Sequence, residues 1–282
     1  MRYVSIEGVA DSVSSIAIGV MKAMPDDPGP AFAILDAFAA AGGNLVDTAH
    51  VYGDGAVDLT LGKWLAARGR DAAMVLGKGC HPKPDGVPRV TPAALEADLG
   101  ESLDRLGTDY LDIFVLHRDD EAVPVGELID ALNRARDAGR IMAFGASNWS
   151  TQRVVAANDY AAAHGLVPFA LNNPGWSLAR PVEPMWPGCV YVDDEYARWH
   201  RQSQLPLLAW SAQAAGFFSG RYESGDGRSG DVVRTYYSDD NFARLHRAQL
   251  LAQRHGVTAI GIALAYVLSQ PFPTIALVGP GD

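Results

Sequence analysis

Four side chains that can hold or transfer a proton occur at or just after the ends of short apolar segments. Asp47 lies near the end of the segment 43–49, Lys78 closes the segment 72–78, and His117 closes the segment 111–117. Tyr52 follows Asp47 by five residues. An ammonium group at the end of an apolar strand loses water, so Lys78 needs a nearby carboxylate, and Asp47 is its natural partner.

The same arrangement would make Tyr52 an acid. Beside a cationic Lys78, the pKa of the Tyr52 phenol is expected to fall from about 10 toward the working pH, so that the phenol becomes a usable proton donor. Any one of these residues alone is more often a solvated terminus or a packing residue. Their joint placement at strand ends favours a catalytic site.

The elements that must position these groups alternate regularly along the chain. Short apolar segments, typical of strands buried on both faces, alternate with longer amphipathic segments typical of helices. The expected strands are 14–20, 43–49, 72–78, 111–117, 141–147, 168–173, 205–212 and 274–279. The expected helices are 30–41, 56–68, 92–106, 125–138, 151–164, 193–202, 241–255 and 258–268.

Eight such units predict a closed parallel sheet, an α/β fold of the (β/α)8 TIM barrel type, as a single domain over residues 1–282. An open dinucleotide-binding sheet is disfavoured because no G-x-G-x-x-G follows the first strand. Residues 257–279 carry no charge, yet Pro271 and Pro273 divide them into a helix and a strand, so we expect core and not a membrane span. The segment 223–232 is polar and rich in glycine and predicts a mobile loop.

Composition excludes some classes of partner. The formal net charge of −10 argues against nucleic acid and anionic membranes, which require a cationic face. Two cysteines, Cys80 and Cys189, provide no disulfide framework, and the N-terminal segment lacks the features of a secretory signal. We therefore expect a cytoplasmic protein with a small-molecule ligand; its oligomeric state is not indicated by the sequence.

The motifs resemble those of the aldo-keto reductase superfamily over nearly the whole chain. They are NLVDTAHVYG at 44–53, LGKG at 76–79, DYLDIFVLH at 109–117, GASNW at 145–149, NNPGWSL at 172–178 and WSAQAAGFFSGRY at 210–222. The resemblance implies reduction of an aldehyde or ketone by hydride transfer from a nicotinamide cofactor, with Tyr52 as proton donor. It further implies that His117 orients the carbonyl and that the Asp47–Lys78 pair tunes Tyr52.

The resemblance also implies a cofactor site at the barrel mouth. Ser147, Asn148 and Asn173 would hold the carboxamide, with asparagine at position 173 where the family usually has glutamine. Trp176 would stack on the nicotinamide in place of the usual tyrosine, and Gly216 and Arg221 would serve the pyrophosphate. The full expected set is Gly19, Val20, Met21, Asp47, Ser147, Asn148, Asn173, Trp176, Trp210, Ser211, Ala212, Gln213, Gly216, Arg221 and Gly279.

Two further expectations concern the cofactor and the substrate. Family members continue beyond Gly279 with a loop and helix that contact the adenosine end, whereas the sequence ends at Asp282, so we expect the last helix to be missing. NADPH is then favoured over NADH only because the resemblance implies the cofactor that is usual in the family. Trp149, after the Ser147–Asn148 pair, is a candidate substrate contact together with Tyr52 and His117, but the substrate itself is not indicated.

Three other functions remain open. Lys78 could form a Schiff base, as in aldolases on this fold, although Asp47 would keep it charged. His50, His81 and His117 with Asp47 could bind a hydrolytic metal, although their spacing is poor and we expect no metal. A barrel of this kind could also bind the cofactor as a regulatory or sensing subunit, although all four catalytic positions are filled.

Overall fold

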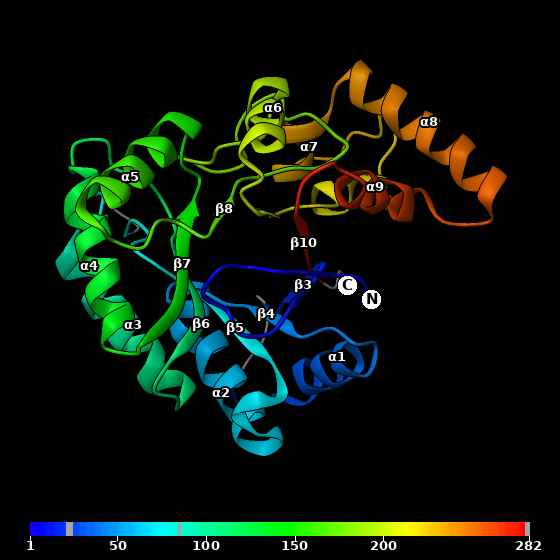
Figure 1. The fold of residues 1–282 in the computed structure, drawn as a ribbon. Helices are drawn as coiled ribbons and strands as arrows, with labels where there is room; N and C mark the ends of the chain where they lie inside the picture. Colours follow the sequence, from blue (N-terminus) through cyan, green and yellow to red (C-terminus); the bar gives the residue numbers. More distant parts are fainter. Residues whose placement is uncertain (21–24, 84–85, 280–282) are drawn as a thin grey trace.

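The structure is a computed structural model, which describes residues 1–20, 25–83 and 86–279. Its centre is a closed barrel of parallel strands in the order β10-β3-β4-β5-β6-β7-β8-β9, with helices around it (Figure 1). The strands are β3 (Ile16–Gly19), β4 (Leu45–Asp47), β5 (Met74–Gly79), β6 (Leu111–Leu116), β7 (Ile141–Ser147), β8 (Leu171–Asn173), β9 (Leu207–Ala209) and β10 (Thr274–Val278). Each expected strand is present, and the predicted single (β/α)8 barrel is confirmed.

The helices also follow the expected order. They are α1 (Gly29–Ala40), α2 (Ala56–Arg68), α3 (Pro92–Leu106), α4 (Val125–Asp137), α5 (Thr151–His164), α6 (Asp194–Ser203), α7 (Asp231–Tyr236), α8 (Asp239–His255) and α9 (Ala259–Leu268). Short 3-10 turns occur at Tyr52–Gly55, Arg70–Ala72 and Ala214–Ser219. The sequence did not predict α7, whose first residue, Asp231, falls within the segment expected to be a loop.

A short hairpin of β1 (Tyr3–Val4) and β2 (Val13–Ser14) also escaped prediction, because each strand has only two residues. Ile6 and Val13 belong to the same buried cluster as the side chains inside the barrel. The hairpin therefore closes the end of the barrel where the strands begin, so the catalytic groups must gather at the other end.

Local sequence explains where helices begin and end. The side chain of Thr91 accepts a hydrogen bond from the backbone N–H of Ala94, and Pro92 follows at the first helical position, where its missing N–H costs nothing. The same helix ends at Gly107, whose φ of 66° suits glycine. Both features fix the crossover from β5 to β6, the two strands that carry Lys78 and His117.

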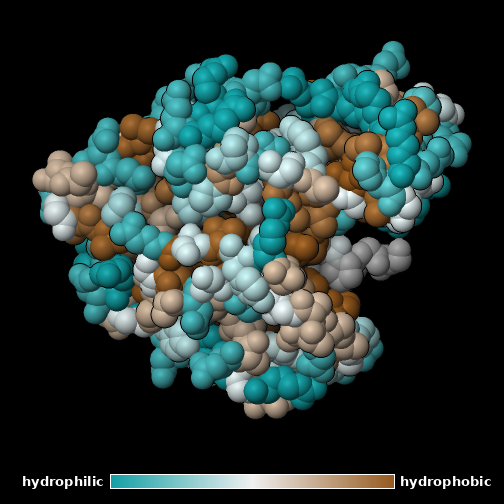
Figure 2. All heavy atoms as spheres, turned by 45° about the vertical axis from the view of Figure 1, so that its right-hand side comes forward, coloured by the Kyte–Doolittle hydropathy of each residue, from teal (hydrophilic) through white to brown (hydrophobic). Residues whose placement is uncertain are grey.

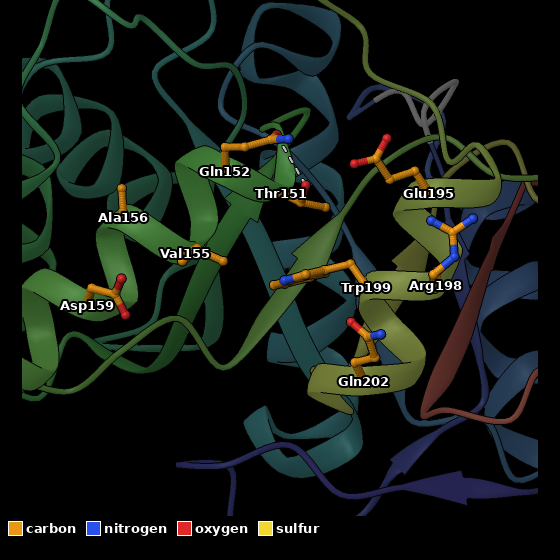
Figure 3. Close-up of a pocket in the computed structure, with 9 residues that line it drawn as sticks. All are labelled: Thr151, Gln152, Val155, Ala156, Asp159, Glu195, Arg198, Trp199 and Gln202. Atoms are coloured by element: carbon orange, nitrogen blue, oxygen red, sulfur yellow. Dashed lines mark hydrogen bonds between the residues drawn. The ribbon is translucent and has the colours of Figure 1, made fainter.

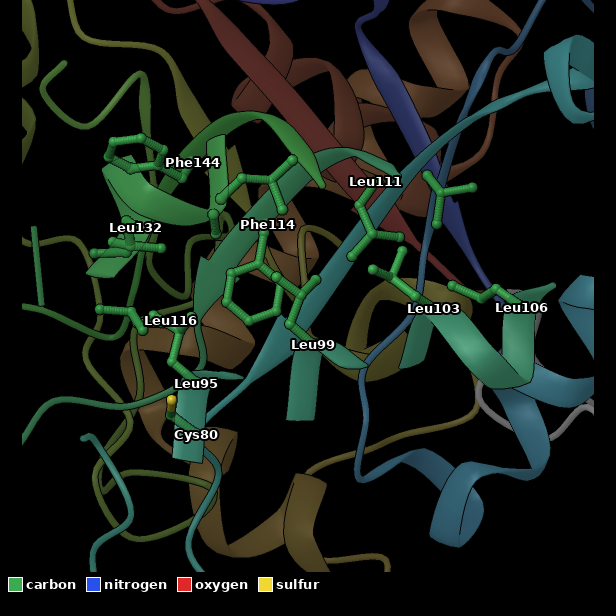
Figure 4. Close-up of a cluster of buried hydrophobic side chains, with 14 of the residues drawn as sticks. Cys80, Leu95, Leu99, Leu103, Leu106, Leu111, Phe114, Leu116, Leu132 and Phe144 are labelled. Carbon is green, nitrogen blue, oxygen red and sulfur yellow. The ribbon is translucent and has the colours of Figure 1, made fainter. Parts of the chain in front are cut away.

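The core has two layers because strand side chains alternate. Ile113 and Val115 of β6 point into the barrel, whereas Phe114 and Leu116 point outward against the helices. In the outer layer, leucines of α3 such as Leu95 and Leu99 pack against Phe114 (Figure 4). Burial on both faces is what produced the continuous apolar segments in the sequence.

The α8 and α9 region forms a lobe at one side of the barrel (Figure 1). Apolar side chains reach the surface in the hollow beside this lobe (Figure 2). Val257, at the junction of α8 and α9, and Tyr266 of α9 are exposed. In the part of the chain that the structure describes, no single helix is long and apolar enough to span a membrane. The α8–α9 pair meets the length and composition criteria together, but it bends by 98° at its junction.

Candidate active site

The ends of β4, β5 and β6 bring the four predicted groups together. Lys78 donates hydrogen bonds to Asp47 Oδ1, to the backbone oxygen of Thr48 at 3.2 Å, and to the phenol oxygen of Tyr52 at 3.2 Å. The rings of Tyr52 and His117 meet edge to face with 5.7 Å between their centroids. Residues far apart in sequence therefore share one mouth because β4, β5 and β6 are neighbours in the sheet.

Lys78 and Asp47 form a buried ion pair, with side chains only 2% and 1% exposed. Burial lowers the pKa of Lys78, but the attraction of Asp47 and Tyr52 and the hydrogen bonds they accept outweigh it, so the pKa lies above its usual value. Lys78 is thus held as a cation. A neutral amine, which a Schiff-base mechanism needs, is disfavoured by this geometry.

The expected lowering of the Tyr52 pKa is wrong. Burial raises the pKa of Tyr52, and Asp47 raises it too, whereas Lys78 and, more weakly, Arg118 oppose the rise; the net pKa lies above the usual value of tyrosine. The sequence indicated the nearby cation but not that burial would outweigh its effect on the pKa of the phenol. Tyr52 is therefore a fully protonated phenol at neutral pH, with a cation placed to stabilise its conjugate base.

His117 is neutral at the same pH. Burial, followed by the charges of Lys78 and Arg118 and by His81, holds the pKa of His117 well below its usual value. The ring of His81 meets that of His117 edge to face at 4.8 Å between centroids. Nδ1 of His117 is buried without a hydrogen-bond partner among the described residues. A neutral imidazole can donate one hydrogen bond to a substrate oxygen without adding charge.

Ser147 and Asn148 lie side by side at the end of β7, as expected. Asn148 donates to the backbone oxygen of His117 at 3.2 Å and to Ser147 Oγ at 3.1 Å. Its Oδ1 accepts from the backbone N–H of Val190 and from the indole of Trp210, both at 3.1 Å. The amide of Asn148 therefore fixes its neighbours and has both N–H donors and both lone pairs engaged.

Asn173 supplies an unsatisfied acceptor beside this pair. Its amide N–H donates to the backbone oxygen of Leu208 at 2.7 Å, and its backbone oxygen accepts from Ser147 Oγ at 2.9 Å. Its side-chain Oδ1 is buried with no partner among the described residues. An acceptor left alone in this way costs free energy unless a ligand completes it, which fits the expected contact with a carboxamide N–H.

Trp176 and Trp210 occupy different layers. The ring of Trp176 stacks on Phe272, with 5.7 Å between centroids, and belongs to the cluster between the barrel and α9. Trp210 instead bonds to Asn148 and lies at 4.9 Å from the ring of Tyr191. Of the two indoles, only that of Trp210 is hydrogen-bonded to a residue of the mouth, and the expected stacking by Trp176 has no support in its contacts.

The expected pyrophosphate segment follows β9 and turns sharply. Ser211 has a φ of 51° and Gly216 a φ of 87°, and the side chain of Arg221 lies so close that a Cβ at Gly216 would be 3.0 Å from it. Ala212 is fully buried, whereas Gln213 is half-buried. The segment can present backbone N–H groups and Arg221 together, which is the donor set that a phosphate needs.

On the other side of this segment, the end of β3 meets the end of β10. A Cβ at Gly279 would approach the backbone oxygen of Gly19 at 3.7 Å, and a Cβ at Gly19 would approach Asp47 Oδ2 at 3.6 Å. Val20 is buried, and Met21 lies outside the described residues. Small residues here leave space above Asp47, whose Oδ2 is buried without a partner among the described residues.

Comparison with known proteins agrees with the barrel fold. The sequence profile of the Aldo/keto reductase family matches residues 15–281. This chain belongs to the aldo/keto reductase family. It is 29% identical to norsolorinic acid reductase of Emericella nidulans, with 93% of this chain and 70% of that protein covered. It is also 29% identical to an aryl-alcohol dehydrogenase [NADP(+)] of Phanerodontia chrysosporium, with 88% and 68% covered.

The fold has a solved counterpart in a glycerol dehydrogenase of Gluconobacter oxydans, with a TM-score of 0.79 and 24% identity over 99% of this chain and 86% of that one. The chain spans about two thirds of the length of the first curated relatives that it matches. Family membership and these relatives support carbonyl reduction with a nicotinamide cofactor as the chemistry of the barrel.

Two other features, one of them expected and one found only in the structure, lie away from the mouth of this aldo/keto reductase barrel. Trp149 is fully buried, donates to the backbone oxygen of Arg118 at 3.0 Å and packs on Phe169, so the expectation that it contacts substrate is wrong. A cavity of about 470 Å3 lies between α5 and α6, lined by Trp199, Glu195 and Arg198 among others (Figure 3). It contains none of the four candidate catalytic groups, so we do not assign the reaction to it.

The metal-binding alternative also lacks support. Within residues 1–20, 25–83 and 86–279, no group of three or more His, Cys, Asp or Glu side chains is placed to hold a metal ion. His50 instead contacts Glu101, with 2.8 Å from Nε2 to the carboxylate oxygen.

Sequence reasoning missed Arg118 and gave His81 no role beyond that of a metal ligand. Arg118 directly follows His117, so its position in the chain placed it at the same strand end. What hid it is that its burial depends on the loop 186–190, whose path the sequence does not reveal.

Proposed function

We propose that this barrel reduces an aldehyde or ketone to an alcohol with NADPH, and that Tyr52 donates the proton. The observation that carries the proposal is the Tyr52 phenol oxygen 3.2 Å from the buried Lys78 ammonium, with His117 packed edge to face on the same phenol. The cation is present where a phenolate would form, and the imidazole is neutral where a carbonyl oxygen would sit.

The residues divide the work as follows. When bound, a nicotinamide cofactor would supply the hydride that reduces the carbonyl. Tyr52 gives its proton to the carbonyl oxygen, and the phenolate that remains lies beside Lys78 until solvent returns the proton. Because burial raises the pKa of Tyr52, the phenol keeps its proton until the substrate oxygen becomes basic enough to take it. Neutral His117 donates a hydrogen bond that orients and polarises the carbonyl.

The proposed cofactor site uses residues from the opposite half of the mouth. Asn173 Oδ1 would accept from the carboxamide, Ser147 would stand beside it, and Trp210 would offer its ring to the nicotinamide. Gly216 and Arg221 would serve the pyrophosphate, while Gly19 and Gly279 leave room at the end of β3. NADPH is favoured because a similar enzyme carries NADP(+) in its name.

A small aromatic carbonyl is the first substrate class to test, since the similar aryl-alcohol dehydrogenase is named for aromatic alcohols. We also propose a cytoplasmic location, which the two buried free thiols favour because thiols remain reduced there.

The test measures turnover of a panel of aromatic aldehydes by Tyr52→Phe and by the unaltered protein. Turnover is monitored as the loss of nicotinamide absorbance. We expect kcat to fall by about 100-fold or more, because general acid catalysis contributes about 10²- to 10⁴-fold. The Kd for NADPH should stay within about threefold, since only one hydroxyl is lost. Unchanged turnover would overturn the assignment of the acid. Cofactor binding without turnover of any carbonyl by the unaltered protein would favour a sensing subunit.

A further inference from the structure

A second cation, Arg118, is buried at the same mouth without a carboxylate. The residue as a whole is only 7% exposed. It donates to the backbone oxygen of His117 at 2.9 Å and, weakly, to that of Pro187 at 3.4 Å. Within the described part of the chain, no ion pair forms at Arg118. A guanidinium has five N–H donors, and these two contacts leave several of them without an acceptor.

Three other partly buried arginines of the barrel, unlike Arg118, form ion pairs with carboxylates. Arg70 pairs with Asp112 at 2.7 Å, Arg89 with Asp98 at 2.6 Å, and Arg153 with Asp119 at 3.1 Å. Those three arginines are only half-buried, whereas Arg118 is buried, and each of the three still has a carboxylate. Burying a guanidinium without a counter-charge costs free energy, which an anionic ligand would offset.

The position of Arg118 places this cation on the substrate side of the mouth. It follows β6, which lies opposite β10 in the ring of strands and away from the loop after β9 that holds Arg221. Gly188 covers its stem, since a Cβ there would lie 3.3 Å from Arg118 Cδ. The charge of Arg118 also acts on the reacting groups: after burial and Lys78, it contributes to the low pKa of His117.

We propose that Arg118 binds a carboxylate carried by the carbonyl substrate, so that the preferred substrates are oxo acids. The proposal rests on the proposed reductase function and names the substrate class for that site. Arg118 suits the role because a guanidinium binds a carboxylate through two parallel hydrogen bonds. A fixed cation at this place also favours binding of a substrate whose carbonyl and carboxylate are held apart by a rigid ring, since both groups are then positioned at once.

The experiment compares 4-carboxybenzaldehyde with its neutral methyl ester, at about 0.15 M salt to screen long-range attraction. The variants are Arg118→Met and Arg118→Lys, with Arg136→Met as the matched control. Arg136 is half-buried and pairs with the neighbouring Asp137, on the helix α4 and away from strand ends, so its loss changes the net charge equally. Turnover is measured as kcat/KM, and binding as the rise in Tm that each compound causes.

For the unaltered protein we expect the acid to be the better substrate. Arg118→Met should lower kcat/KM for the acid about 10- to 100-fold, because a hydrogen bond to a charged group is worth about that factor. The value for the ester should stay within about threefold. Arg118→Lys should retain part of the preference, and Arg136→Met should retain all of it. The rise in Tm caused by the acid should disappear in Arg118→Met alone.

Equal losses for acid and ester in Arg118→Met would overturn the proposal, because they would mean that Arg118 only holds the loop at Pro187. An unchanged preference in Arg118→Met would overturn it as well. If neither compound is turned over but the acid still raises Tm through Arg118, the carboxylate site stands and the reductase function fails. If the ester is reduced and the acid is not bound, the reductase function stands and the site fails.

Discussion

The buried Lys78–Asp47 pair gives the sharpest test of how the site is assembled. Lys78→Met leaves Asp47, which is 1% exposed, without its cation. Asp47→Asn leaves Lys78 with neutral acceptors only, which are the amide oxygen of the new side chain and the oxygens of Thr48 and Tyr52, each at 3.2 Å. Removing one member of a buried pair typically destabilises a protein by about 3–5 kcal/mol. The double variant removes both charges and should lose far less than the sum of the two.

The magnitude follows from the unpaired charge. If each single variant loses about 4 kcal/mol, independent effects would add to about 8 kcal/mol, whereas the double variant should lose only about 2–4 kcal/mol. Urea unfolding at equal m values measures these losses, and Lys63→Met, at an exposed lysine, serves as control. Reductase turnover should stay low in the double variant although its stability recovers, because Tyr52 has still lost the neighbouring cation.

Additive losses, within about 0.5 kcal/mol, would show that the two charges do not depend on each other. Recovery of turnover together with stability would refute the role of Lys78 in stabilising the Tyr52 phenolate.

Two further predictions concern stability. Burial lowers the pKa of His200 from 6.5 to about 4. The unfolded chain therefore binds this proton more readily than the folded protein does. The stability that neutral His200 contributes is full above pH about 6.5 and is lost as the pH falls toward 4. The loss at pH 5 should be about 2 kcal/mol, and His200→Gln, but not the exposed control His246→Gln, should remove this part of the pH dependence; an unchanged slope in His200→Gln would contradict it. Gly145→Ala should cost about 3 kcal/mol or more, because the added Cβ would lie 2.3 Å from the backbone oxygen of Leu171 on the neighbouring strand. Gly100→Ala in α3, where the nearest neighbour is a flexible arginine tip at 3.5 Å, should be near neutral, and similar Tm values for the two variants would refute the close packing of β7 on β8.

The sequence was sufficient for the barrel and for the meeting of the four candidate catalytic groups at its mouth. Continuous apolar segments such as 111–117 are produced by burial on both faces of a strand, and this signal is local. The carboxyl ends of the parallel strands of a barrel all lie at the same end of it, so Asp47, Lys78 and His117 had to meet there once the alternation of strands and helices was established. Short elements such as β1 and β2, held by contacts with the rest of the chain, gave no comparable signal.

The direction of each pKa and the role of each aromatic ring depended on tertiary structure. Lys78 was correctly paired with Asp47, but the pKa of Tyr52 rises because burial, the largest effect, outweighs the attraction of Lys78. Trp176 faces α9 and Trp210 faces Asn148, a choice made by how the chain turns after β8 and β9. Charge and hydration are sums over everything nearby, and a linear pattern contains only the neighbours along the chain.

Arg118 shows the same division most clearly. Its place after His117 was fixed by the sequence, and so was its nearness to the reaction. Its burial without a carboxylate was decided by the loop 186–190, which arrives from about 70 residues away and covers the side chain. Strand periodicity therefore determined which residues stand at the mouth, and long-range packing determined which of their charges and hydrogen-bonding groups remain available to a ligand.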